Sequence, residues 1–186
     1  MDMKEKNIFK RFDNYILQIV NTRMKTRALD LFFPKYTKLA GVGFLCVLIF
    51  ALYMMADSVK QKAFVIELGF LQVLTAGIVH IMKFLAKRVR PYDLLEGLNT
   101  FDIFLPDYSF PSGHTAAACS IATVVSYYYP GFVGVFIIYA TLIGISRMYL
   151  AVHFPTDVLV GAFVGILITT LGHNFLSPMV LNYVLN

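Results

Sequence analysis

Two charged side chains stand alone in the apolar C-terminal stretch of the sequence. Residues 114–186 carry only Arg147 and Asp157 as charged groups, and His153 lies between them. A charge within a bilayer-length segment costs about 2.5–3.5 kcal/mol on insertion scales, so such residues mark candidate functional sites. A cation and a carboxylate that flank a histidine are typical of the active site of a membrane enzyme.

Three cations and a helix start form a candidate phosphate site. Lys83, Arg90 and Arg147 all lie close to the ends of apolar stretches. Guanidinium groups match phosphate oxygens bidentately, and a lysine adds a point charge. Ser112 and Gly113 precede a further apolar stretch, where a helix N-terminus presents free backbone N–H groups to an anion. These groups together indicate a cradle for phosphate.

Two histidines could act on the phosphate that this cradle would hold. Asp157 follows His153 by four residues, and Pro155 is suited to the first turn of a helix. The Asp157 carboxylate could accept a proton from one imidazole nitrogen of His153 and leave the other nitrogen free to attack. His114 could donate a proton to the leaving oxygen.

The sequence does not suggest a metal site or a cofactor. The three aspartates of the loop before His114 are scattered in sequence, at Asp93, Asp102 and Asp107. No Cys/His spacing typical of a metal site is present. We therefore expect phosphoryl chemistry without a metal, in which the three cations offset the phosphate charge.

The composition predicts an all-α polytopic membrane helix bundle. Of the 186 residues, 58% are hydrophobic and 15% are charged, whereas soluble domains are about 45–50% apolar and about 25% charged. A membrane helix needs about 20 apolar residues, although about 17 can suffice. Five transmembrane helices are expected, at residues 39–56, 63–82, 113–129, 131–150 and 157–176.

The N-terminal segment is basic and amphipathic. Residues 1–38 hold nine of the sixteen Lys and Arg, with Phe9, Phe12 and Ile16 at helical spacing. This pattern predicts a helix that lies in the membrane interface and meets anionic headgroups rather than nucleic acid. A solvated basic tail is the alternative. We expect one membrane domain, 1–186, in which 39–186 form the bundle.

The order of the predicted helices brings three motifs to one side of the membrane. If successive helices are antiparallel, the end of one helix and the start of the next share a membrane face. One face therefore contains the end of the second predicted helix and the start of the third. It also contains the end of the fourth and the start of the fifth. It therefore collects Lys83-x6-Arg90-Pro91 (83–91), Pro111-Ser112-Gly113-His114 (111–114) and Ser146-Arg147-x5-His153-x3-Asp157 (146–157).

These three motifs resemble the tripartite signature of the type 2 phosphatidic acid phosphatases, a superfamily that also includes the vanadium haloperoxidases. All eleven fixed identities are present at the spacings of that family. The resemblance implies metal-independent hydrolysis of a lipid phosphate or diphosphate through a phosphohistidine. By analogy His153 is the nucleophile, Asp157 orients it and His114 is the general acid. The phosphate ligands would be Lys83, Arg90, Ser112, Gly113 and Arg147.

The resemblance favours undecaprenyl diphosphate as the substrate, because short bacterial undecaprenyl-diphosphatase-like members share this layout of helices. Phosphatidate or phosphatidylglycerophosphate is the alternative substrate, and a non-catalytic lipid-phosphate binder or flippase is the alternative class. We expect a multi-pass protein of the bacterial plasma membrane. The distribution of Lys and Arg favours a cytoplasmic active face, the family resemblance favours the outer face, and the oligomeric state stays open.

Overall fold

The computed structural model describes residues 7–101 and 103–185, and every regular element in that part of the chain is helical. Residues 1–6, 102 and 186 lie outside the described residues, and so does the expectation about Asp102. The helices are α1 (Ile8–Gln18), α2 (Arg27–Tyr36), α3 (Val42–Met54), α4 (Val59–Ala86), α5 (Pro91–Leu94), α6 (Gly113–Tyr128), α7 (Val133–Tyr149) and α8 (Pro155–Leu185).

The all-α membrane bundle is confirmed, but the count of five transmembrane helices is not. Within the described residues, α4, α7 and α8 are long and apolar enough to cross a membrane, and a bent pair could supply a fourth span. That pair is Arg27–Ala40 and Val42–Met54, which meet at 56°. The 16 residues of α6 would rise only about 24 Å, less than the roughly 30 Å hydrocarbon core.

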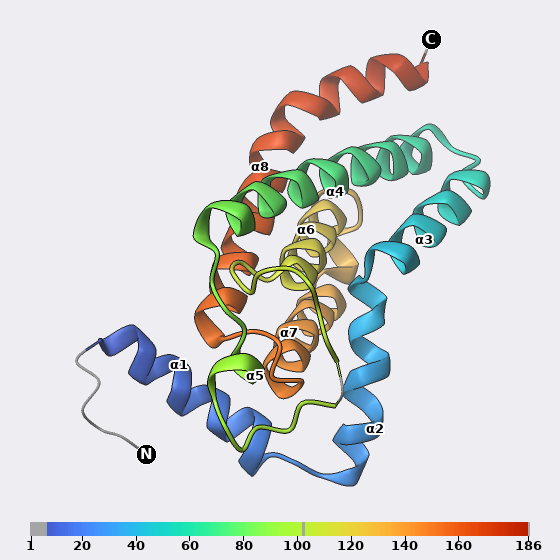
Figure 1. Cartoon of the computed structure of the whole chain (residues 1–186). Coiled ribbons are helices and arrows are strands. Elements are labelled where there is room, and N and C mark those ends of the chain that lie inside the picture. Colours follow the sequence, from blue (N-terminus) through green and yellow to red (C-terminus); the bar gives the residue numbers. More distant parts are fainter. Residues whose placement is uncertain (1–6, 102, 186) are drawn as a thin grey trace.

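Helix α6 is the centre of the bundle. It lies in the middle of Figure 1 and packs against α4, α7 and α8. One apolar cluster joins Leu45 of α3 and Leu71 of α4 to Val124 of α6. Because its neighbours enclose it, α6 can be short and still bury its backbone away from lipid.

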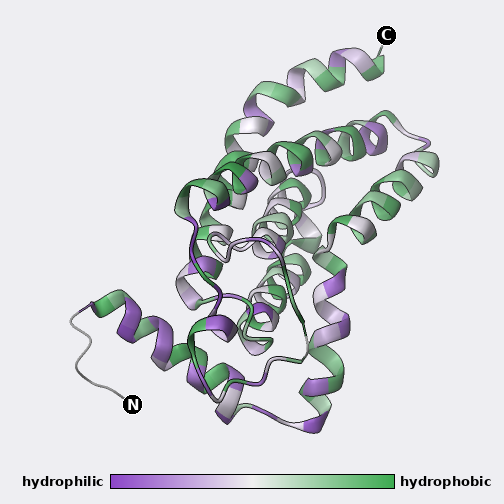
Figure 2. Ribbon diagram, viewed as in Figure 1, coloured by the Kyte–Doolittle hydropathy of each residue, from purple (hydrophilic) through white to green (hydrophobic). Residues whose placement is uncertain are grey.

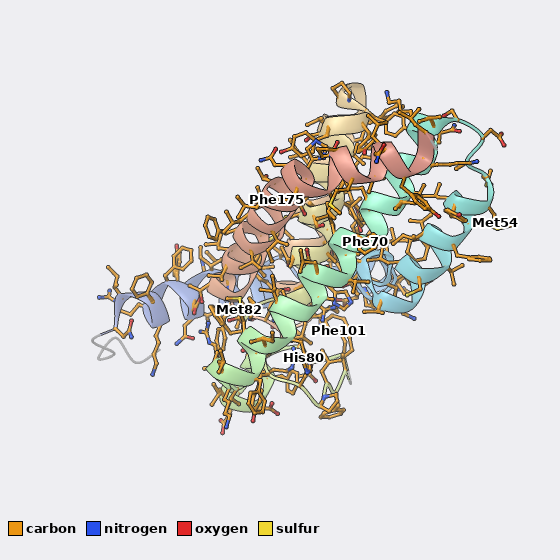
Figure 3. All side chains as sticks on the ribbon, turned by 90° about the horizontal axis from the view of Figure 1, so that it is seen from above. Met54, Phe70, His80, Met82, Phe101 and Phe175 are labelled. Atoms are coloured by element: carbon orange, nitrogen blue, oxygen red, sulfur yellow. The ribbon has the colours of Figure 1, made fainter. Side chains whose placement is uncertain are left out.

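The outer surface of the bundle is apolar, as expected of a protein whose solvent is lipid. Met54, Phe70 and Phe175, labelled in Figure 3, are 61–75% exposed. Hydrophobic residues dominate α3, α7 and α8, whereas hydrophilic and hydrophobic residues alternate along α1 (Figure 2). The chain is therefore a multi-pass membrane protein with a polar end.

The predicted amphipathic N-terminal helix is present as α1. Asn7 begins it, because its side-chain oxygen accepts the Phe9 backbone N–H at 3.0 Å. Phe9 and Phe12 point outward, whereas Asp13 and Leu17 are buried against the rest of the protein. The apolar face is thus available to lipid, and a carboxylate faces inward.

Two glycines let α8 approach α6 closely. A methyl group at Gly161 would lie 2.5 Å from the Ser112 carbonyl oxygen, and one at Gly165 would lie 2.2 Å from the Ala116 carbonyl oxygen. Real Cβ atoms do not come this close to backbone, so any side chain at these positions would push the helices apart. This contact fixes the start of α6 against the start of α8.

We expect Gly165→Ala to destabilise the protein, because the methyl group would clash with a backbone atom that cannot rotate away. Overpacking of this kind typically costs about 1–3 kcal/mol. A lowered thermal unfolding midpoint in detergent would show it. In the control, Gly77→Ala in α4, the added methyl group has open space, so the midpoint should stay constant or rise. Equal midpoints for the two variants would contradict the close contact.

Candidate active site

The ends of α4 and α7 supply the cations. Lys83 lies in the last turn of α4, which ends where Lys87 takes a left-handed conformation with φ of 47°. The chain then extends to Arg90, which immediately precedes Pro91 at the start of α5. Arg147 lies in the last turn of α7. All three cations are buried.

The starts of α6 and α8 supply the remaining candidates. Gly113 and His114 open α6, and Asp157 lies in the first turn of α8. His153 lies in the short connection between α7 and α8 and is 2% exposed. Ser112 precedes α6, and its backbone N–H donates to the Asp157 carbonyl oxygen at 3.0 Å.

Six of the eight predicted site residues line a single cavity of about 930 Å³. Its polar end contains both histidines and all three cations. The six residues are Lys83, Arg90, Gly113, His114, Arg147 and His153. The cavity thus brings together groups that are separated by up to 70 residues in sequence.

The other two predicted residues do not line the cavity. Ser112 is the N-cap residue of α6, but its hydroxyl lies 2.9 Å from the Thr115 hydroxyl and makes no capping hydrogen bond to the helix backbone. Ser112 packs closely against Gly161, and this contact keeps Ser112 inside the protein. Asp157 is fully buried behind His153.

His153 is held by a backbone carbonyl rather than by Asp157. Its Nδ1 lies 2.6 Å from the Ser109 carbonyl oxygen, whereas the nearest Asp157 carboxylate oxygen is 3.7 Å away. A carbonyl can only accept, so Nδ1 carries the proton and Nε2 keeps its lone pair. The expected direct hydrogen bond from His153 to Asp157 is therefore absent, but the tautomer it was expected to fix is still enforced.

The surroundings of His153 keep the imidazole neutral. Burial, followed by the charges of Arg147, Arg90 and Lys83, holds the pKa of His153 well below its usual range. A neutral ring with a free Nε2 is the form that can attack an electrophile.

Arg88 bridges two buried carboxylates close to His153. Its guanidinium lies 2.6 Å from an oxygen of Asp157 and 2.6 Å from an oxygen of Asp13. The second Asp157 oxygen accepts the Phe154 backbone N–H at 2.8 Å. Asp13 also accepts hydrogen bonds from the backbone N–H and hydroxyl of Thr156. The interfacial helix α1 is thus connected to the carboxylate beside His153.

Arg147 is the cation with the fewest protein partners at this site. One of its terminal nitrogens donates to the Thr37 hydroxyl at 2.8 Å. Its Nε is buried and has no hydrogen-bond partner among the described residues. An unsatisfied buried donor is unfavourable, and Arg147 lines the cavity, so its guanidinium is suited to an anionic ligand there.

Most of the cavity wall is apolar and comes from α3 and α4. From the polar end the cavity extends between these helices, past Val79 and Ala76, toward Tyr53 and Val65. On α3 it reaches Leu45, Cys46, Ile49 and Phe50. Such a channel suits a long apolar tail attached to an anionic head.

Several groups at the site were not predicted from the sequence. These are Asp13, Thr37, Arg88, the Asp107 carboxylate and the Ser109 carbonyl oxygen. A backbone carbonyl leaves no signal in side-chain patterns. Arg88 did carry a signal, since it lies two residues before Arg90 within the first motif.

The fold and the site together define a membrane-embedded helix bundle with a cavity lined by three buried cations and by His114 and His153. Comparison with known proteins agrees with this class. The family model described as the PAP2 superfamily matches residues 64–178, more than half of the chain. The chain therefore belongs to the PAP2 superfamily.

The curated relatives of the chain include two phosphatases with different substrates in their names and one transport permease protein. The undecaprenyl-diphosphatase of Sulfolobus acidocaldarius is 25% identical over 87% of this chain and 76% of its own. The bacitracin transport permease protein BcrC of Bacillus licheniformis is 30% identical over 62% of this chain. The chain spans 57% of the length of BcrC and 39% of phosphatidylglycerophosphatase B of Bacillus subtilis, which is 42% identical over the matched part.

Two solved structures share the fold. Aquifex aeolicus LpxE superposes with a TM-score of 0.72 and 31% identity, covering 87% of this chain and 94% of LpxE. A transmembrane PAP2-type phosphatidylglycerolphosphate phosphatase from Bacillus subtilis gives a TM-score of 0.71 and 25% identity, covering 92% of this chain and 87% of its own.

Proposed function

We propose that the protein is a metal-independent membrane phosphatase that hydrolyses a lipid phosphate or diphosphate, with undecaprenyl diphosphate as the leading substrate. One observation carries the proposal: two histidines and three cations line the polar end of a cavity whose remaining wall is apolar. Such a cavity can hold a phosphorylated head and a hydrocarbon tail at the same time.

In the proposed first step, Nε2 of His153 attacks phosphorus and the bond to the lipid oxygen breaks. The negative charge of the bound phosphate offsets the surrounding cations and favours a protonated His114. His114 gives its proton to that oxygen, so the lipid leaves as a neutral alcohol or as a monophosphate with one proton added. Lys83, Arg90 and Arg147 offset the charge on the phosphoryl oxygens. The backbone N–H of Gly113, at the start of α6, adds a hydrogen bond.

In the second step, water attacks the phosphohistidine and the phosphorus–nitrogen bond breaks. The now neutral His114 takes a proton from that water, and inorganic phosphate is released. The phosphohistidine ring is cationic while Nδ1 keeps its proton. The Asp157 carboxylate, 3.7 Å away, and the Ser109 carbonyl oxygen would both stabilise that charge.

Phosphate release from a panel of lipids in detergent, with EDTA present, tests this function. The panel should contain undecaprenyl diphosphate, phosphatidylglycerophosphate and phosphatidate. We expect release that EDTA does not abolish and that is fastest with undecaprenyl diphosphate. A preference for phosphatidylglycerophosphate would support the alternative substrate. Loss of all activity in EDTA, restored by a divalent cation, would contradict the mechanism.

The other functional class is a non-catalytic lipid-phosphate binder or flippase, and the name of one relative, a transport permease protein, favours this class. A binder would need the cations but not two imidazoles that line the same cavity. Binding of undecaprenyl diphosphate without any phosphate release would favour this class over the phosphatase.

Arg88 is expected to position Asp157. Arg88→Lys keeps a positive charge but cannot bridge Asp13 and Asp157 with a planar fork. Neither Arg88 nor Asp157 lines the cavity, so we expect kcat to fall by up to about 10²-fold while KM changes little. Steady-state kinetics in detergent measure kcat and KM separately and so test this prediction.

The control for this prediction is Arg11→Lys, because Arg11 lies on the exposed side of α1. Its kinetics should match the wild type. A rise in KM with constant kcat in Arg88→Lys would show instead that Arg88 contacts the substrate.

A further inference from the structure

A carboxylate already bridges two of the three candidate phosphate cations. One oxygen of Asp107 lies 2.7 Å from Lys83 Nζ, and the other lies 2.5 Å from a terminal nitrogen of Arg90. Asp107 also lines the cavity that holds both histidines. The two oxygens of a carboxylate contact Lys83 and Arg90 as two oxygens of a phosphate would.

The loop that contains Asp107 uses most of the donors of these cations. Lys83 Nζ also donates to the Tyr108 carbonyl oxygen at 2.6 Å. Arg90 donates from Nε to the Asp107 carbonyl oxygen and from a terminal nitrogen to the Val152 carbonyl oxygen. A lysine has three N–H donors and an arginine has five. A phosphate that reached these two cations would therefore meet donors that are already engaged.

Asp107 remains charged under all ordinary conditions. Burial raises the pKa of its carboxyl, but the hydrogen bonds and charges of Lys83 and Arg90 outweigh it and lower the pKa to about 2. Its side chain is 48% exposed, so water reaches the carboxylate while it contacts the two cations. Arg147, in contrast, has no carboxylate partner and a buried Nε without a hydrogen bond among the described residues.

We propose that Asp107 is an internal anion that occupies the Lys83 and Arg90 positions of the phosphate cradle and competes there with phosphate groups. This inference rests on the proposed function, since it assumes that the same cations bind the phosphoryl group of the substrate. Substrate phosphate displaces the carboxylate from the cations, and the tail, held in the apolar channel, favours the exchange. Inorganic phosphate has no tail, so the returning carboxylate displaces it after hydrolysis.

A different role for Asp107 would give the opposite effect. If Asp107 only held Lys83 and Arg90 in place, its loss would weaken the binding of every anion. If it competes with phosphate, its loss strengthens the binding of small anions. Like charges a few ångström apart repel, and the repulsion is stronger near a protein surface than in water. The sign of the change therefore separates competition from positioning.

The test compares the inhibition constants of orthophosphate and orthovanadate for the wild type, Asp107→Asn and Asp93→Asn in detergent. We expect both constants to fall at least about fivefold in Asp107→Asn and to stay unchanged in Asp93→Asn, whose side chain is exposed in α5. Asp107→Ser should behave like Asp107→Asn, and serves as a second neutral variant should the asparagine variant not fold. Asp107→Glu, which keeps the charge, should stay near the wild type.

Unchanged or raised inhibition constants in both neutral variants would overturn the competition between Asp107 and phosphate. The proposed function would still stand if the wild type hydrolyses lipid phosphate and is inhibited by vanadate. A wild type that neither releases phosphate nor binds vanadate would remove the proposed function itself. The two failures are therefore distinct.

Discussion

His153→Ala is expected to lower lipid-phosphate hydrolysis by about 10⁴-fold or more, because removing a covalent nucleophile leaves only binding and electrostatic stabilisation. The imidazole is buried, its Nδ1 is engaged by the Ser109 carbonyl oxygen, and its Nε2 is left for attack. No other imidazole at the polar end of the cavity has its tautomer fixed by a hydrogen bond among the described residues. Phosphate release from undecaprenyl diphosphate in detergent measures the loss.

A matched control for this variant is His80→Ala, because His80 also lines the cavity but lies on α4, one helical turn before Lys83. It should keep most of the activity. The His153→Ala protein should elute from size-exclusion chromatography as the wild type does, and lipid binding should persist because all three cations remain. Activity within tenfold of the wild type in a folded His153→Ala protein would exclude this residue as the nucleophile.

His114→Ala is expected to reduce hydrolysis by about 10²–10⁴-fold for lipid substrates. The reason is that a lipid alkoxide is a poor leaving group and needs a proton as the bond to phosphorus breaks. A substrate with an acidic leaving group, such as p-nitrophenyl phosphate, needs that proton much less. The loss should therefore be far smaller with p-nitrophenyl phosphate than with phosphatidate.

The comparison of leaving groups is the useful part of this experiment, because it separates proton donation from phosphate binding. Arg147→Ala should weaken hydrolysis of both substrates to a similar extent, since the phosphoryl group is the same. An equal loss for both substrates in His114→Ala would assign His114 to binding rather than to acid catalysis.

Much of the fold could be predicted from the sequence because the bilayer limits the choices. Long apolar stretches at 63–82, 131–150 and 157–176 coincide with α4, α7 and α8 to within two residues or lie inside them, and helices satisfy every backbone group in lipid. The expected first span, 39–56, was less regular. Gly41 is extended, with ψ of 145°, and breaks the helix there, so α3 meets the preceding helical segment at an angle. Hydropathy does not encode such a bend.

The candidate site was predictable where motif residues lie at helix ends, and less so where the loop before α6 decides the contacts. Antiparallel order alone brings Lys83, His114 and Arg147 to one face of the bundle. The partner of His153 depends on the path of residues 103–112, which places the Ser109 carbonyl closer than the Asp157 carboxylate. Asp107 was noted only as a scattered acid, because its two cationic partners lie 24 and 17 residues away in sequence.

In the proposed mechanism His153 forms a covalent bond to phosphorus, and this intermediate can be measured directly. Wild-type protein mixed with a ³²P-labelled lipid phosphate should be quenched in alkali within one turnover, digested and mapped. We predict an acid-labile, alkali-stable label on the peptide that contains His153, absent from His153→Ala and retained for longer in His114→Ala. An actively hydrolysing wild type that never carries label on this peptide, or label that persists in His153→Ala, would contradict it.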